Sequence, residues 1–296
     1  MNSRRQFLGV IGGGLAGALA PVKESLAAEE KKHSFQGPFG LQLYSLRHQI
    51  VPGNAATVKE AMAYGKQVGY TEMEAPELYG LPAKEYRSLL DEVGLPCTSM
   101  MATYDQFKTQ LRTVAENAHT LGATNVVNAW IPHHGPFTLE LCRETAGIYN
   151  TWGKKLHAEG LHFGHHTHGY EFQPYQGHPL FDTLVKETNP EYVDFEMDIF
   201  WVVDPGESPV AYLKKYPNRW RLMHLKDMKK GPPTHNYTGS EPVSWDEPLG
   251  AGRMDIPAIL REAARVGVKH YYVEDESLRA HEQIVEDLHY LKTVRL

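Results

Sequence analysis

Residues 121–128, Leu-Gly-Ala-Thr-Asn-Val-Val-Asn, join the end of a helix-like segment to a short apolar run of strand length. Before them, Phe107, Leu111 and Val114 begin an apolar pattern with the three- and four-residue spacing of one helix face. Gly122 closes this pattern, and glycine can end a helix in the left-handed conformation without steric cost. This junction of helix, glycine and strand is the unit from which we predict the fold.

The same junction recurs along the chain. Helix-like segments end in glycine and continue into a strand-like run at Gly69, Gly94, Gly122, Gly160 and Gly267. Helical spacing of apolar residues predicts helices within residues 86–93, 107–121, 141–156, 256–263 and 284–291. Short apolar runs predict strands at residues 39–44, 70–74, 98–101, 125–130, 161–166, 192–197, 220–225 and 270–274.

The alternating elements predict an α/β fold, a single (β/α)8 barrel. Strands that are apolar on both faces are typical of a parallel sheet covered by helices. Eight strand–helix pairs over about 270 residues fit a closed TIM barrel better than an open doubly wound sheet. No G-x-G-x-x-G motif follows a predicted strand, which argues against a dinucleotide site. We expect one domain over residues 29–296, in which the long irregular segment at residues 228–254 acts as a lid.

Composition excludes several classes of protein. The chain has 296 residues, with 30 Lys and Arg against 36 Asp and Glu, and a net charge of −6. An acidic chain without a basic block is unsuited to general nucleic-acid binding, which requires phosphate neutralisation. The two cysteines, Cys97 and Cys142, lack zinc-ligand spacing and cannot form a disulfide scaffold. The 16 histidines are unusual, and we expect more than half of them to be surface or packing residues.

The N-terminus has the pattern of an export signal. A Ser-Arg-Arg-Gln-Phe-Leu motif at residues 3–8 precedes an apolar stretch at residues 9–20 and small residues at 25–28. This order resembles a twin-arginine signal, so we expect residues 1–28 to be cleaved and the protein to be periplasmic or otherwise exported. The alternative is an uncleaved anchor, but the apolar stretch is shorter than the ~20 residues of a stable span. Twin-arginine export moves folded proteins, which favours a cofactor loaded before export without naming it. A weakly bound ion such as Mn²⁺ would lose to Zn²⁺ or Cu²⁺ outside the cytoplasm.

Polar residues follow most of the predicted strands, where TIM barrels carry their catalytic groups. These candidates are Gln42 and Tyr44; Glu74 and Glu77; Asn128 and Trp130; His166, His168 and Glu171; Asp198; His224, Lys226 and Asp227; and Glu274, Asp275 and Glu276. Taken singly, each acidic residue could be a helix N-cap or a surface group. Several carboxylates and imidazoles arriving together from strands five to eight indicate a cation site, because such groups are costly to desolvate without a partner.

Three of these positions are the best defined. His224 ends an apolar strand, although a core histidine bound to a backbone carbonyl is an alternative. Alternation directs Glu196 and Asp198 to the same side of their strand, and Asp198 alone lies at the barrel mouth. Glu274 ends its strand in the same way, with Glu276 on the same face as the alternative in a shifted register.

Longer motifs carry a family resemblance over essentially the whole mature chain. They are Gly-Leu-Gln-Leu-Tyr-Ser-Leu-Arg at residues 40–47, Gly-His-His-Thr-His-Gly-Tyr-Glu-Phe at 164–172, Glu-Met-Asp-Ile-Phe-Trp at 196–201, His-Leu-Lys-Asp-Met at 224–228, Pro-Leu-Gly-Ala-Gly-Arg-Met-Asp at 248–255 and Tyr-Val-Glu at 272–274. With these motifs the chain resembles the sugar phosphate isomerase/epimerase family, the xylose-isomerase-like TIM barrels. They are highly specific for the family and weakly specific for substrate.

The resemblance implies one divalent metal ion held by side chains from strands five to eight. The ligands that carry over directly are Asp198, His224 and Glu274. We assign Glu171 as the strand-five ligand, with His166 or His168 as the substitute, because this chain departs from the family pattern around these residues. Mn²⁺ is the expected ion, with Mg²⁺, Co²⁺ or Zn²⁺ as alternatives.

The resemblance further implies isomerisation or epimerisation of a carbohydrate through an enediolate. The expected catalytic side chains are Glu171, Glu274, His166, His168 and Lys226. The two glutamates form the acid–base pair, and one histidine moves a proton or orients a hydroxyl. The lysine pairs with the developing oxyanion or holds Asp198. The expected substrate-binding side chains are Gln42, Tyr44, Glu74, Asn128, Trp130 and Trp201.

Three other functions stay open at this point. A lyase that eliminates across a 3-keto-glycoside or keto-sugar would use the same enolate, and export favours it because phosphorylated sugars are scarce outside the cytoplasm. A phosphodiesterase of the endonuclease IV type would need several zinc ions and a basic groove, whereas the chain without residues 1–28 has a net charge of −8. A sugar-binding protein would keep the pocket without turnover. The oligomeric state is also open.

Overall fold

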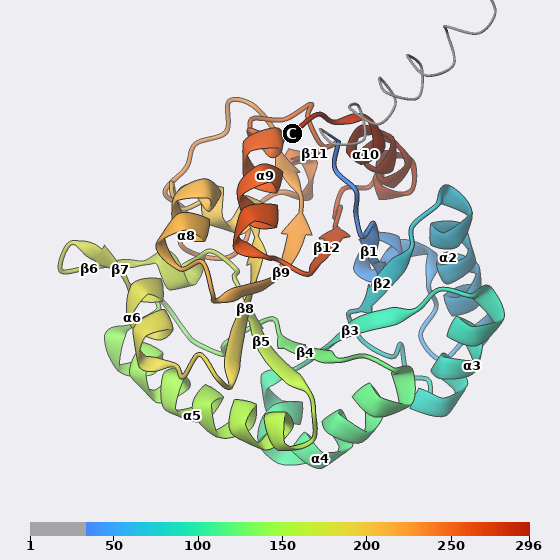
Figure 1. Cartoon of the computed structure of the whole chain (residues 1–296), viewed down its shortest axis with the longest axis horizontal. Helices are drawn as coiled ribbons and strands as arrows, with labels where there is room; N and C mark the ends of the chain where they lie inside the picture. The colour runs from blue at the N-terminus through green and yellow to red at the C-terminus, as the bar shows by residue number, and fades with distance from the viewer. Residues whose placement is uncertain (1–33) are drawn as a thin grey trace, which may run out of the picture.

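The structure is a computed structural model that describes residues 34–296, and within them eight parallel strands close into a barrel (Figure 1). In barrel order the strands are β1 (Gly40–Gln42), β12 (His270–Val273), β9 (Trp220–Leu225), β8 (Val193–Asp198), β5 (His162–His166), β4 (Asn125–Asn128), β3 (Cys97–Ala102) and β2 (Glu72–Ala75). Each predicted strand overlaps one of them, so the predicted α/β fold and (β/α)8 barrel are confirmed. The predicted export signal at residues 1–28 lies outside the described residues.

Helices surround the barrel (Figure 1). They are α2 (Ala55–Val68), α3 (Ala83–Val93), α4 (Tyr104–Leu121), α5 (Leu139–Ala158), α6 (Leu180–Glu187), α7 (Ile199–Val203), α8 (Pro209–Lys215), α9 (Ile256–Val266) and α10 (Ala280–Thr293). The five helices predicted from apolar spacing are α3, α4, α5, α9 and α10, whereas α6, α7 and α8 are too short to show several turns of that spacing. In the part of the chain that the structure describes, no helix is both long and apolar enough to span a membrane.

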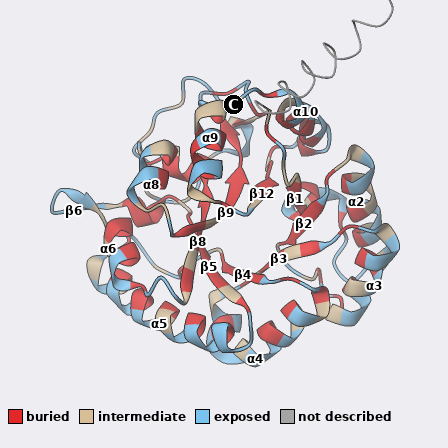
Figure 2. Ribbon diagram, in the orientation of Figure 1, coloured by how far each residue is buried: buried red, intermediate tan, exposed pale blue. Residues whose placement is uncertain are grey.

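The junction at Gly122 shows why sequence and structure agree here. Thr103 and Gln106 form a capping box that begins α4, and Gly122 ends it with a φ of 79°. On its inner face, Phe107 stacks on Trp152 of α5 at 5.2 Å between ring centroids. Burial follows the same division throughout, with buried residues along the strands and inner helix faces and exposed residues outside (Figure 2).

The predicted lid segment, residues 228–254, is more ordered than expected. Its two ends pair as an antiparallel hairpin of β10 (Asp227–Met228) and β11 (Asp246–Glu247), with a 3-10 turn, η3 (Val243–Trp245), between them. The Asp227 carboxylate accepts hydrogen bonds from the backbone N–H groups of Met228, Gly250, Gly252 and Met254. One buried side chain therefore organises both ends of the segment at the carboxyl end of the barrel.

Two shorter features complete the chain between β5 and β8. They are the 3-10 turn η2 (Tyr170–Phe172) and a hairpin of β6 (Pro174–Tyr175) and β7 (His178–Pro179). A further 3-10 helix, η1 (Leu43–Gln49), follows β1. With these elements, the strand ends that carry the predicted site residues all open onto one end of the barrel.

Candidate metal centre

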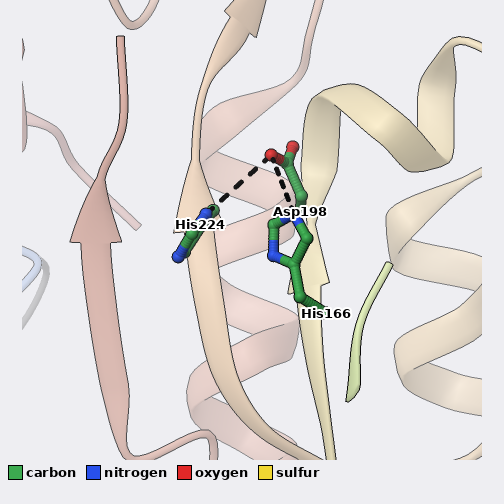
Figure 3. Close-up of side chains that lie close together, drawn as sticks. All are labelled: His166, Asp198 and His224. Atoms are coloured by element: carbon green, nitrogen blue, oxygen red, sulfur yellow. Dashed lines mark ion pairs between the residues drawn. The ribbon is translucent and has the colours of Figure 1, made fainter. Parts of the chain in front are cut away.

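Three side chains from neighbouring strands converge at the carboxyl end of the barrel. His166 ends β5, Asp198 ends β8, and His224 lies one residue before the end of β9. The strands pair so that Asp198 lies opposite His224, and each of the three residues offers one ligand atom within 4.8 Å of the others. Figure 3 shows the Asp198 carboxylate paired with both imidazoles, as the dashed lines mark. All three side chains are buried, so their electrostatic interactions are poorly screened.

The Asp198 carboxylate is only half satisfied by protein. Its Oδ1 accepts the backbone N–H groups of Phe200 at 2.8 Å and Trp201 at 3.3 Å, which caps the start of α7. Its Oδ2 has no hydrogen-bond partner among the described residues and lies 4.0 Å from both His166 Nε2 and His224 Nδ1. A buried carboxylate oxygen without a partner is costly, and a cation between these three atoms would remove that cost.

Glu274 lies beside this group as a fourth donor. It directly follows β12, and its Oε2 is 3.2 Å from His224 Nδ1. Burial opposes its ionisation, but His224 and Lys226 outweigh burial and lower the pKa of Glu274 to about 2. Burial instead raises the pKa of Asp198 to about 7. Two carboxylate oxygens and two imidazole nitrogens form a donor set that suits Mn²⁺, Co²⁺ or Zn²⁺, so these residues fit the predicted divalent ion.

Lys226 is a buried cation held by carboxylates. Its Nζ forms an ion pair with Glu276 and lies 3.8 Å from Asp246 Oδ2 and 3.9 Å from Glu274 Oε2. Burial alone would lower the pKa of Lys226, but the surrounding carboxylates, Asp246 foremost, raise it well above its usual value. The ammonium group therefore stays charged beside Glu274, and its two predicted roles stay predictions.

Glu171 lies apart from the group of potential ligands. Its Oε1 is 2.7 Å from His165 Nε2, and both of its oxygens are 3.1 Å from the backbone N–H of His168. It is fully buried and does not line the cavity described below. The structure thus brings His166, the substitute considered from the sequence, into the group in place of Glu171. The imidazole that engages Glu171 is supplied by His165.

A cavity of about 550 Å³ lies over the ligand group. His166, His168, Glu274 and Glu276 contribute polar groups to its lining. Such a volume lies within the ~300–1,000 Å³ of small-molecule sites. Other lining residues include Gln42, Tyr44, Met101, Tyr104, Trp130 and Pro132.

The predicted substrate-binding residues divide into two sets. Gln42, Tyr44 and Trp130 line the cavity, whereas Glu74, Asn128 and Trp201 are buried and do not line it. The Asn128 side-chain oxygen accepts from Tyr149, and its amide donates to the backbone of Ala102. Trp201 stacks on His168, with 4.7 Å between ring centroids. The substrate-binding roles of all six residues stay predictions.

His168 faces the cavity as a neutral base. Burial is the largest effect on its imidazole and lowers the pKa of His168 to about 4, against the opposing charges of Glu171 and Glu276. Within residues 34–296 its Nδ1 has no hydrogen-bond partner. A neutral imidazole with an unpartnered nitrogen can accept a proton at neutral pH.

The lid segment lies directly over this histidine. A Cβ added at Gly239 would fall 2.8 Å from the His168 carbonyl oxygen and 2.9 Å from the Trp130 ring, so the segment contacts both residues closely. His133, one of the unassigned histidines, stacks on Trp130 at 5.2 Å between centroids. The segment therefore contacts two residues that line the cavity.

Sequence reasoning left one buried residue of the site without a role. Glu196 points into the barrel as alternation predicted, and its Oε2 lies 3.1 Å from His166 Nδ1 and 3.4 Å from His224 Nε2. The signal that could have identified it is its place two residues before Asp198 on the same face of β8.

Comparison with known proteins identifies the family and some relatives of this chain. The family model for the xylose isomerase-like TIM barrel matches residues 61–294. Inosose dehydratase 2 of Bacillus cereus is 33% identical over 94 residues, which is 32% of this chain and 31% of that protein. The match thus spans about a third of the length of the curated relatives.

Solved structures show the same fold. A sugar phosphate isomerase/epimerase from Parabacteroides distasonis has a TM-score of 0.70 at 22% identity, covering 86% of this chain and 97% of that chain. The IOLI protein, described with a bound zinc atom, has a TM-score of 0.66 at 13% identity, covering 86% and 96%.

Proposed function

The chain belongs to the xylose isomerase-like TIM barrel family, and from this premise we propose that it is a divalent-metal-dependent isomerase or epimerase of a carbohydrate. The observation that carries the proposal is the unpartnered Oδ2 of Asp198, 4.0 Å from an imidazole nitrogen on either side and beneath a cavity of small-molecule size. A solved isomerase/epimerase with the same fold supports the choice of reaction class.

His166, Asp198, His224 and Glu274 would hold the ion in this proposal. A bound divalent cation would polarise a sugar carbonyl and stabilise negative charge on its oxygen. We propose Mn²⁺, with Zn²⁺ as the main alternative because imidazole and carboxylate donors suit both ions. Protein purified without added metal, analysed for its metal content, tests this choice.

Proton transfer is assigned to two groups that line the cavity from different strands. Glu274 follows β12 and is ionised, while His168 follows β5 and is neutral at pH 7. Either of these unprotonated groups can take a proton from a carbon beside the carbonyl and, once protonated, return it at the adjacent carbon, which isomerises the sugar. Epimerisation, in which a proton is returned to the opposite face of the same carbon, requires the second group to be protonated beforehand. This pair replaces the Glu171–Glu274 pair predicted from the sequence, because Glu171 does not line the cavity.

Other residues would orient the sugar and balance its charge. The Lys226 ammonium does not line the cavity, but it pairs with Glu276, which does, and its positive charge would favour negative charge that develops on a substrate oxygen. Tyr44 and Trp130 offer apolar ring faces of the kind that pack on sugars. Gln42 also lines the cavity; its amide donates to Glu74, and its oxygen accepts from the Tyr44 N–H and keeps one further lone pair for a hydroxyl.

A second candidate is a lyase acting on a keto-sugar or 3-keto-glycoside. The observation that favours it is the similarity to inosose dehydratases, although this match spans about a third of their length. Elimination starts with the same loss of a proton beside a carbonyl. The electron pair then expels an oxygen substituent from the next carbon, and the group that took the proton, Glu274 or His168, gives it to that oxygen.

One experiment separates these candidates. The metal-loaded protein is incubated with a panel of keto-sugars and 3-keto-glycosides in D₂O, and products are followed by NMR. Deuterium at a carbon beside the carbonyl, with an intact isomerised sugar, supports the isomerase. An unsaturated product with a released fragment supports the lyase. Ligand binding without deuterium exchange contradicts both and supports a binding protein.

We also propose that the protein is exported by the twin-arginine route, on the motif at residues 3–8. Replacing Arg4 and Arg5 together by lysine is expected to retain the protein in the cytoplasm, as measured by cell fractionation. Unchanged export of this variant would contradict the proposal.

A further inference from the structure

Two carboxylates lie directly beneath the ligand group. Glu74 on β2 and Glu196 on β8 are fully buried, and neither lines the cavity. Glu74 Oε1 lies 2.7 Å from His224 Nε2, and Glu196 Oε2 lies 3.1 Å from His166 Nδ1. Each of the two imidazoles thus has one nitrogen near a deep carboxylate and the other near Asp198.

We propose that Glu74 and Glu196 are positioning residues that fix the ring orientation and tautomer of the two histidine ligands. Glu196 accepts the Nδ1–H of His166, which leaves the Nε2 lone pair for the ion. Glu74 accepts the Nε2–H of His224, which leaves the Nδ1 lone pair for the ion. Histidine ligands of metals commonly donate their other N–H to a carboxylate in this way. The inference rests on the proposed metal site.

The two histidines present different nitrogens, and this is the observation that carries the inference. The atoms of the two rings that lie 4.0 Å from Asp198 Oδ2 are Nε2 of His166 and Nδ1 of His224. Glu196 and Glu74 contact the opposite nitrogens of the two rings. His224 Nδ1 also lies 3.2 Å from Glu274 Oε2, itself a proposed ligand, so a hydrogen shared by these two atoms would be displaced when the ion binds. The His166 and His224 rings come from different strands, and Glu196 and Glu74 hold the nitrogen of each ring that faces away from Asp198. The remaining nitrogens, Nε2 of His166 and Nδ1 of His224, therefore face the same position beside Asp198 Oδ2.

Glu74 is itself held on several sides. Its Oε1 also accepts from the Gln42 side chain at 2.6 Å, and its Oε2 accepts from the Ser99 hydroxyl. Gln42 lines the cavity, so Glu74 lies behind a substrate-facing side chain and not at the surface of the cavity. These contacts explain its burial without a direct contact to substrate, in place of the substrate-binding role predicted from the sequence.

A second metal ion is the competing explanation. Glu74, Glu196 and His224 also place one potential ligand atom each within 4.8 Å of one another. However, the shared atom would be His224 Nε2, which lies at hydrogen-bond distance from Glu74. A hydrogen on this nitrogen satisfies the contact and leaves no lone pair for a second ion.

The test uses full-length protein and Zn²⁺. Glu74→Gln and Glu196→Gln are compared with Glu72→Gln, a matched control on β2 whose carboxylate lies 2.9 Å from His270 Nδ1, away from the metal group. Isothermal titration should show one ion per chain, with affinity reduced about 10- to 100-fold in the first two variants and within twofold of wild type in the control. Circular dichroism and thermal melting establish that each variant is folded.

Nitrogen NMR of the histidine rings in the zinc-loaded protein reports which ring nitrogen binds zinc and which carries a hydrogen. A general loss of stability would not change this assignment. We expect zinc on Nε2 of His166 and Nδ1 of His224, with hydrogens on the opposite nitrogens, and altered N–H signals in the two variants. Zinc on the other nitrogens, two ions per chain, or affinities within twofold of wild type in both variants would overturn the inference. Failure of wild type to bind an ion overturns it together with the proposed function, whereas expected affinities without substrate exchange overturn the proposed function alone.

Discussion

The two ends of the barrel both carry histidine–carboxylate pairs, but they differ in what is left unpaired. At the amino end, His270 pairs with Glu72 at 2.9 Å and His162 with Asp194 at 3.3 Å, and Asn125 accepts from Arg221 at 2.6 Å. These residues lie at the first or second position of their strands. In each of these three pairs the two side chains satisfy each other, as expected of groups that stabilise a fold.

At the carboxyl end, by contrast, some buried polar atoms of the described residues have no hydrogen-bond partner. In the part of the chain that the structure describes, Asp198 Oδ2, His168 Nδ1 and Glu196 Oε1 are buried without hydrogen-bond partners. All three belong to β5, β8 or the residues just after them. Histidine next to a carboxylate is therefore not what distinguishes a candidate metal site. The distinguishing feature is a set of buried donor atoms that the protein alone leaves unsatisfied.

The largest expected effect comes from removing the charge of the central unpaired oxygen. Asp198→Asn keeps an oxygen to cap α7 but replaces the metal-facing carboxylate. We expect Mn²⁺ or Zn²⁺ affinity to fall by at least about 100-fold, more than an outer-shell change typically causes. Titration calorimetry measures this. Asp194→Asn at the amino end is the control, and an equal loss in both variants would remove the distinction between the two ends.

A variant of Glu171 tests whether a paired carboxylate at the carboxyl end contributes to stability and not to metal binding. Because its carboxylate pairs with His165 and lies apart from the ligand group, Glu171→Gln is expected to lower the free energy of unfolding by about 2–3 kcal/mol. Metal affinity should change less than threefold. Denaturant unfolding and metal titration measure the two effects. Loss of the metal with normal stability would make Glu171 the strand-five ligand, as the sequence predicts.

Asp204, at the end of α7, tests whether every buried carboxylate without a partner is a candidate metal ligand. It is buried with both oxygens unpartnered within the described residues, but it faces Glu241 of the lid and belongs to neither group of potential metal ligands. Burial, with Glu241 adding to it, raises the pKa of Asp204 to about 8. The folded protein then holds a proton that the unfolded chain releases from about pH 4 upward, so stability falls as pH rises from 4 to 8.

Asp204→Asn removes this titration. Relative to wild type, we expect little change in the free energy of unfolding at pH 4 and a gain of about 1–2 kcal/mol at pH 8. Denaturant unfolding across this pH range measures the difference, and metal affinity should be unchanged. A difference that is independent of pH would show that Asp204 is ionised in the folded protein.

The fold was predictable because its signals are local and repeated. The glycine at position 122 ends α4 by its own conformational freedom, and apolar spacing marks each long helix regardless of its neighbours. Asp198, His224 and Glu274 could likewise be singled out, because a strand end has a definite place in a barrel. Even so, their role as metal ligands stays a prediction.

The rest of the site depends on contacts that sequence spacing does not encode. His165 engages Glu171 only because η2 turns the chain back onto β5, and this turn decides which strand-five residue joins the ligand group. Glu74 and His224 are 150 residues apart and meet across the barrel interior. Alternation places each on the inner face of its strand but does not give the depth at which they meet.

The smallest expected effect concerns the lid, residues 228–254, which contacts His168 and Trp130 at the carboxyl end of the barrel. Gly239 has a φ of 68°, and a Cβ there would contact the His168 carbonyl and the Trp130 ring. Gly239→Ala should therefore displace the segment slightly and raise KM about three- to tenfold, with kcat and metal affinity nearly unchanged. Steady-state kinetics on the substrate identified by deuterium exchange measures this.

Gly231→Ala, at a φ of 103° in the same segment but with no atom within 4 Å of the added Cβ, is the matched control. If both variants raise KM equally, backbone strain in the segment and not its contact with His168 and Trp130 governs access to the cavity.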